Sequence, residues 1–99
     1  MIRHIVLFEL TTTDPAEKDA QVEAARVALE GLVGVVPGLR SMQVSRNVAY
    51  DGRNADFILI ADFDDLAALE AYQVHPEHVK AADYIGTIRS ARYAIDLEV

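Results

Sequence analysis

The stretch Tyr72–His78, with the sequence YQVHPEH, decides how the second half of this chain folds. Pro76 must interrupt a helix, because proline has no backbone N–H and the residue before it disfavours the α-helical region. The same stretch places a phenol and two imidazoles close together. Histidine titrates near neutral pH and is the usual side chain for general acid–base catalysis, and tyrosine can donate a hydrogen bond to a developing oxyanion. The stretch therefore predicts a broken helix that carries candidate catalytic groups.

Helical and strand patterns lie on both sides of this stretch. Before it, residues 56–63 form a predicted strand that is apolar on both faces and includes Phe57 and Leu59. Asp64 or Asp65 then caps a helix that should end before Pro76, and Pro76 opens a further helix. The apolar residues that these two helices direct inward are Leu66, Leu69, Tyr72, Val79, Ala82, Ile85 and Ile88. A last strand follows, in which Tyr93, Ile95 and Leu97 alternate with other residues.

The first half of the chain predicts a strand over residues 2–10. His4, Val6 and Phe8 share one face of that strand, and Ile5 and Leu7 share the other. The centre of the strand is therefore apolar on both faces.

A long helix and a second strand are predicted next. Asp14 is the expected N-cap, Pro15 takes the first helical position, and Pro37-Gly38 ends the helix. Its inward residues are Val22, Ala25, Leu29, Leu32, Val33 and Val36. Residues 39–48 form a half-exposed strand, and residues 50–54, with Asp-Gly at their centre, form a hairpin turn.

The predicted order is β-α-β-β-α-β, with the second helical segment broken at Pro76, so the fold class is α+β and ferredoxin-like. Right-handed crossovers place the helices on one face of an antiparallel four-stranded sheet. The other face carries apolar residues that nothing in the chain covers. Exposing even ~400 Å² of apolar sheet forgoes about 10 kcal/mol of burial. We therefore expect a homodimer in which two sheets pack face to face, a dimeric α/β barrel.

Composition restricts the class of protein. The chain has 99 residues, predicted to form one domain over 1–99, and 52% of them are apolar. A net charge of -7 and scattered arginines argue against nucleic acid and anionic membranes as partners. No apolar run reaches the about 18 residues that a membrane span needs, and a strand pattern from Ile2 leaves no room for a signal peptide. Without cysteine there is no disulfide or zinc–thiolate site. We expect a cytoplasmic location.

The chain resembles the stress-responsive A/B barrel (Dabb) family of dimeric α/β-barrel proteins. The resemblance covers nearly the whole length, and its most specific part is the Tyr-x-x-His-Pro-x-His pattern of residues 72–78. The other segments that carry it are residues 2–8, 36–39, 63–65 and 95–96. It implies a homodimer with a small-molecule cavity between the helices and the concave sheet. Some plant members are polyketide cyclases that close a linear poly-β-ketone by aldol condensation.

The resemblance also implies site residues. Tyr72 and His78 match the catalytic residues of the cyclase members, and Asp96 matches a carboxylate near the catalytic imidazole. His4 matches a pocket position, and Phe57, which stands where the cyclase members have another histidine, is also expected to bind the substrate. Val6 and Phe8, which share the strand face of His4, complete the expected binding surface together with Leu59.

The position of His78 indicates its protonation state. In the first turn of a helix that begins at Pro76, the helix dipole disfavours imidazolium, whereas Asp96 as a partner would favour it. A neutral imidazole is what a general base requires. His75 precedes the proline and is interpreted as a helix cap. His75, Glu77 and His78 provide too few ligands for a closed zinc site, so no metal and no other cofactor is predicted.

The leading hypothesis is therefore binding of an unidentified small molecule, with cyclase, aldol or isomerase chemistry on a β-keto compound. In it, His78 abstracts an α-proton, Tyr72 polarises the carbonyl and Asp96 orients His78. Two alternatives stay open. One is a non-catalytic stress-responsive protein whose value lies in stable assembly. The other is a cofactor-free or haem-degrading monooxygenase of the same architecture. Such enzymes often depend on Trp, Asn or a haem-ligating His; this chain has no Trp, and Asn47 and Asn54 lie near a hairpin.

Overall fold

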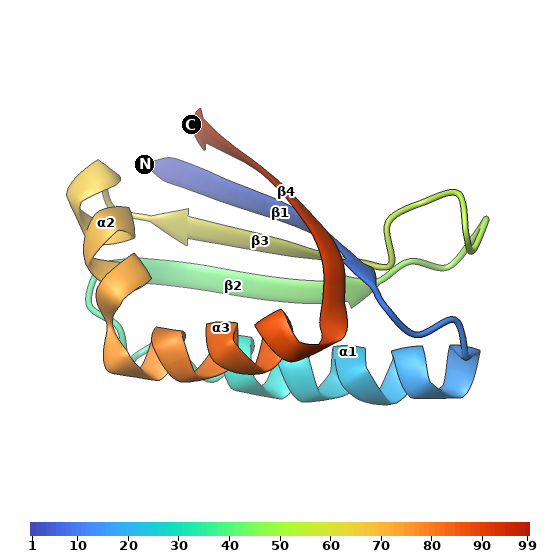
Figure 1. Cartoon of the computed structure of the whole chain (residues 1–99). Helices are drawn as coiled ribbons and strands as arrows, with labels where there is room; N and C mark the ends of the chain where they lie inside the picture. Colours follow the sequence, from blue (N-terminus) through green and yellow to red (C-terminus); the bar gives the residue numbers. More distant parts are fainter.

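The chain folds into a four-stranded antiparallel sheet with helices on one face (Figure 1). A computed structural model describes all of residues 1–99. The elements are β1 (Ile2–Leu10), α1 (Pro15–Glu30), β2 (Leu39–Arg46), β3 (Phe57–Phe63), α2 (Leu66–Val74), α3 (Pro76–Ile88) and β4 (Arg89–Glu98). The strands lie in the order β2-β3-β1-β4 across the sheet. This arrangement confirms the predicted ferredoxin-like α+β fold.

Side chains cap the starts of all three helices. Asp14 accepts a hydrogen bond from a backbone N–H in the first turn of α1 at 3.0 Å, and Asp65 does the same for α2 at 2.8 Å. α2 ends before Pro76, as predicted, and His75 then caps α3 by accepting through Nδ1 from the N–H of Glu77 at 3.1 Å. His75 is thus a helix cap, and its Nδ1 faces the backbone.

α1 ends earlier than the sequence predicts. It stops at Glu30 rather than at Pro37-Gly38. Gly31 follows directly, and Gly34 adopts a φ of 85°, a conformation outside the helical region that glycine accepts at little cost. As a result Val33, predicted to face the core, is exposed, whereas Val36 remains buried in the turns that lead to β2.

The hydrophobic core fills the space between the sheet and the helices. Antiparallel pairing places Val6 opposite Leu59 and Phe8 opposite Phe57 on the covered face. All four side chains are buried, and His4 on the same face is only 4% exposed. The structure thus confirms which face of the first strand the helices cover.

A buried ion pair joins α1 to the ends of β1 and β3. Lys18 Nζ lies 2.7 Å from Asp56 Oδ1, and Asp56 Oδ2 accepts from the backbone N–H of Leu10 at 2.7 Å. Both side chains are less than a tenth exposed. The pair was not predicted, because its two residues are far apart in sequence and neither belongs to a recognisable motif.

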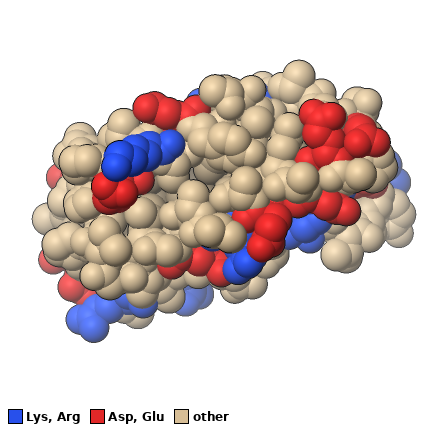
Figure 2. All heavy atoms as spheres, turned by 90° about the horizontal axis from the view of Figure 1, so that it is seen from below, with Lys and Arg blue, Asp and Glu red and all other residues tan.

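The helix side of the molecule carries both signs of charge. Figure 2 shows basic and acidic side chains next to each other on this side, rather than one basic patch. Arg26 of α1 pairs with Glu23 and Glu30, and Lys80 of α3 pairs with Glu77. None of the helices is long and apolar enough to cross a membrane.

No helix covers the opposite face of the sheet (Figure 1). Pairing places Ile5 opposite both Ile60 of β3 and Ile95 of β4, so these side chains form an apolar strip across three strands. The strongly exposed members of this face are Leu7, Tyr93, Ile95 and Leu97. The face is thus an apolar surface with no partner inside the chain, as the strand patterns predicted.

Candidate functional site

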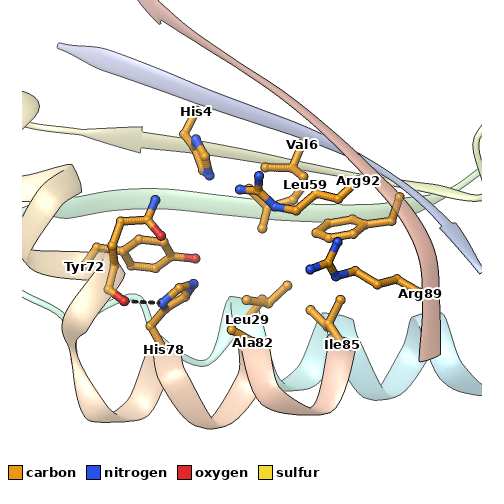
Figure 3. Close-up of a pocket in the computed structure, with 12 residues that line it drawn as sticks. His4, Val6, Leu29, Leu59, Tyr72, His78, Ala82, Ile85, Arg89 and Arg92 are labelled. Carbon is orange, nitrogen blue, oxygen red and sulfur yellow. Dashed lines mark hydrogen bonds between the residues drawn. The ribbon is translucent and has the colours of Figure 1, made fainter. Parts of the chain in front are cut away.

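A cavity of about 360 Å³ lies between the sheet and the helices (Figure 3). Its apolar wall comes from both layers and consists of Val6, Phe8, Leu29, Leu59, Ala82 and Ile85. Its polar groups belong to His4, Tyr72, Gln73, His78, Arg89 and Arg92. An apolar cavity with a few convergent polar groups is the usual form of a small-molecule site.

Tyr72 brings a buried hydroxyl to this cavity. Its ring lies edge-on to Phe63, with 4.9 Å between the ring centroids, and the residue is only 1% exposed. The hydroxyl has no hydrogen-bond partner within the protein, although buried phenols normally have one. Burial raises the pKa of Tyr72, so the hydroxyl keeps its proton and remains a donor. The hydroxyl is therefore a buried hydrogen-bond donor that has no partner within the protein.

His78 lies beside Tyr72, with 4.0 Å between the two ring centroids. Its Nδ1 is 3.3 Å from the backbone carbonyl oxygen of Gln73. A carbonyl oxygen can only accept, so Nδ1 carries the proton and Nε2 is the unprotonated nitrogen of the neutral ring. Burial lowers the pKa of His78, and the nearby charges of His4 and Arg92 act in the same direction. The imidazole is therefore neutral at pH 7 and able to accept a proton.

Asp96 orients His4 and not His78, which corrects the predicted role of this carboxylate. His4 Nδ1 lies 2.5 Å from Asp96 Oδ1. The reason is strand register, because His4 and Asp96 are directly opposite each other on β1 and β4. The His4 ring extends into the cavity (Figure 3). The carboxylate–imidazole pair thus exists, but on the other histidine of the site.

Phe57 does not line the cavity, which corrects a second prediction. Its ring stacks on that of Phe8, with 4.6 Å between centroids and 17° between planes, and the residue is 2% exposed. Phe57 therefore supports the cavity wall from behind Phe8. The other predicted binding residues, His4, Val6, Phe8 and Leu59, all line the cavity.

Arg89 and Arg92 were missed by the sequence analysis. Residues three apart in a regular strand point to opposite faces of the sheet. Here the register shifts at Glu9 and Leu10, so that Leu10 is opposite Arg89 while Phe8 is opposite Arg92. This irregularity gives both arginines the cavity side of β4, as bulges commonly re-aim side chains. Nothing in the local sequence marks its position.

No three His, Asp or Glu side chains come together in a cluster that could hold a metal ion. His75, Glu77 and His78 each make a separate local contact. His75 caps α3, Glu77 pairs with Lys80, and His78 bonds to the carbonyl of Gln73.

Comparison with known proteins gives one family match. The model of the stress responsive A/B barrel domain (Dabb) matches residues 2–99. No curated protein matches the chain.

Solved structures match over nearly the whole chain. A dimeric ferredoxin-like protein of unknown function from Bacteroides fragilis is 30% identical, with a TM-score of 0.88 over 99% of this chain and 95% of that one. A dimeric ferredoxin-like protein from Thermobifida fusca is 30% identical, with a TM-score of 0.81 over 99% and 90%. A cofactor-independent oxygenase from Streptomyces nogalater, 14% identical, shares the fold with a TM-score of 0.71 over 99% and 91%.

Proposed function

The chain belongs to the stress responsive A/B barrel (Dabb) family, and from that premise we propose that it binds a small β-keto compound in its cavity and transfers a proton on it. One observation carries the proposal. The buried hydroxyl of Tyr72 has no partner within the protein and lies beside the imidazole of His78, a neutral base. A hydrogen-bond donor next to a base is the arrangement that enolisation of a ketone requires.

The chemistry follows from these two groups. His78 Nε2 takes the acidic α-proton of the substrate, and the electron pair of the C–H bond moves toward the keto oxygen. Tyr72 donates its O–H to that oxygen as negative charge develops on it. The enolate then either attacks a second carbonyl of the same molecule, which closes a ring and leaves an alkoxide that takes the proton back from His78, or receives that proton at another carbon. His4, held by Asp96, positions the ligand from the sheet side.

We also propose that the functional unit is a homodimer. The uncovered sheet face, with Leu7, Tyr93, Ile95 and Leu97 exposed, supports this assembly. The two ferredoxin-like structures at 30% identity are both described as dimeric. Each protomer then keeps its own cavity, because the cavity lies on the helix side of the sheet.

The open cavity favours ligand binding over a purely structural role. A purely structural role does not account for a buried hydroxyl without a partner on a residue that lines this cavity. The monooxygenase interpretation is supported only by the fold, which this chain shares with the Streptomyces nogalater oxygenase.

Exchange of the α-protons of methyl acetoacetate in deuterated water, followed by NMR, tests the proposal. We expect the wild-type protein to accelerate exchange over buffer and His78→Asn to lose about 10²–10⁴-fold of that acceleration. His75→Asn is the matched control, since it removes an imidazole three residues away while asparagine still caps α3. Exchange by His78→Asn at the wild-type rate would contradict the proposed function. So would a wild-type protein that does not accelerate exchange over buffer.

A further inference from the structure

We infer that the cavity takes a carboxylate-bearing ligand and that Arg89 and Arg92 bind the carboxylate. The inference rests on the proposed function, because it assigns a second subsite to the same cavity and narrows the substrate class to β-keto acids. It starts from the irregular register of β4, which places both guanidinium groups on the cavity side of the sheet.

Arg89 and Arg92 differ from the other arginines of the chain in having no partner. Four of the other arginines form ion pairs with carboxylates: Arg3, Arg26, Arg40 and Arg46. Arg53 lies over the ring of Tyr50. Neither the side chain of Arg89 nor that of Arg92 makes a hydrogen bond or an ion pair within the protein, although acidic side chains outnumber basic ones by 16 to 9. Both extend into the same cavity (Figure 3).

The cavity supplies no anion to these two cations. Its lining contains two arginines and no acidic residue. Asp96, a carboxylate on the same face of β4 as Arg92, is already bonded to His4. Two like charges facing one partly enclosed space repel each other, and an anion between them removes that repulsion. Guanidinium groups bind carboxylates with two parallel hydrogen bonds, which gives direction as well as energy.

The rest of the lining indicates what the carboxylate is attached to. Val6, Leu59 and Ile85 form apolar walls, so the ligand carries its charge on a hydrocarbon skeleton rather than on a polar sugar or nucleotide. The arginines reach in from β4, across the cavity from Tyr72 and His78 (Figure 3). A carboxylate held by the arginines therefore leaves the neighbouring keto group facing Tyr72.

Hexanoate and hexanamide are suitable probes, because they have the same length and nearly the same shape and differ in charge. Their binding is followed by NMR through the side-chain N–H signals of Arg89 and Arg92, assigned with Arg89→Gln and Arg92→Gln. We expect wild-type protein to bind hexanoate about 10- to 100-fold more tightly than hexanamide, the strength of charge-assisted hydrogen bonds. Added salt should weaken only hexanoate binding.

Each glutamine variant should lose most of the preference for hexanoate. Arg53→Gln, which removes an arginine outside the cavity, should keep it. If a cavity variant does not fold, the wild-type comparison of the two probes still decides the question. Equal affinity for hexanoate and hexanamide overturns the inference, as do arginine signals that hexanoate does not move at millimolar concentration.

The two proposals fail in different ways. If the wild-type protein binds hexanoate and hexanamide equally but still accelerates exchange of neutral methyl acetoacetate, only the carboxylate subsite is overturned. If the wild-type protein prefers hexanoate but does not accelerate exchange of the α-protons, only the proposed proton transfer is overturned, and the subsite is supported.

Discussion

The imidazole of His78 is the group on which the proposed chemistry depends most, because it must be neutral to accept a proton. Its surroundings favour that state. Burial is the largest cause that lowers the pKa of His78, and the positive charge of Arg92 adds to it. The hydrogen bond to the carbonyl of Gln73 acts in the opposite direction but does not outweigh them.

We therefore predict that His78 titrates below the ordinary histidine value of about 6.5. The exchange rate should stay constant from pH 8 down to neutral pH and fall only when acid protonates His78. Arg92→Gln should raise the pKa of His78 but leave it below the ordinary value, because the burial remains. NMR titration of the imidazole protons measures this directly. A pKa above about 7 in the wild type would contradict the assignment of His78 as a base that is free at neutral pH.

The motif of residues 72–78 indicated two residues that line the cavity, Tyr72 and His78, because their chemistry and spacing are visible in one short segment. Their catalytic roles stay a prediction. Asp96 was assigned to the wrong histidine, because a carboxylate on β4 can orient either imidazole and only strand register decides between them. Arg89 and Arg92 were missed for a similar reason, since an irregular register is set by pairing between strands and not by the local sequence.

At the scale of elements, the approach of α2 to the start of β2 determines where Tyr72 lies. Gly38 has a φ of 82°, and a Cβ at that position would come within 2.6 Å of the Cβ of Ala68 on α2. The Ala68 Cβ is fixed to the helix backbone and cannot turn away. Glycine at this position therefore allows α2, and Tyr72 with it, to pack closely on the sheet.

Gly38→Ala should destabilise the protein more than Gly34→Ala. Both glycines have a positive φ, which costs an alanine about 1 kcal/mol, but a Cβ at Gly34 meets nothing within 4 Å. The difference between the two variants isolates the collision with Ala68, which we expect to add about 1–3 kcal/mol. Urea denaturation measures both free energies of unfolding. Equal losses in the two variants would show that the contact between α2 and β2 does not constrain the fold.

Most elements were predictable, because helix caps and alternating strands are local signals. The end of α1 was not, since the apolar pattern continues through Val36 while Gly31 and Gly34 end the helix first. Leu66 and Val79, predicted to face inward, are exposed for a related reason. Short helices that cover only part of a sheet leave some positions of their apolar pattern uncovered.

At the scale of the whole molecule, we propose that a second copy of the chain covers the open sheet face. Ile95 lies on the edge strand β4 of this face, opposite Ile5, and is 56% exposed in the single chain. Light scattering should give a mass of twice 10.9 kDa at micromolar concentration.

Ile95→Glu should weaken or abolish the dimer, because a carboxylate buried without a partner is costly at an interface. Val27→Glu is the matched control, since Val27 is 60% exposed on α1, and it should leave the mass unchanged. A folded wild-type monomer, or a dimer that tolerates Ile95→Glu, would rule out the sheet face as the interface.

The central claim is that the Tyr72 hydroxyl donates a hydrogen bond to a bound carbonyl. Methyl acetoacetate labelled at its ketone carbon tests it, because hydrogen bonding moves the NMR signal of a carbonyl carbon downfield. We predict a downfield shift on binding to the wild type that is lost in Tyr72→Phe, with little change in stability because the hydroxyl has no partner within the protein. The same bound shift in both proteins, or a Tyr72→Phe variant destabilised by about 1–3 kcal/mol, would contradict the claim.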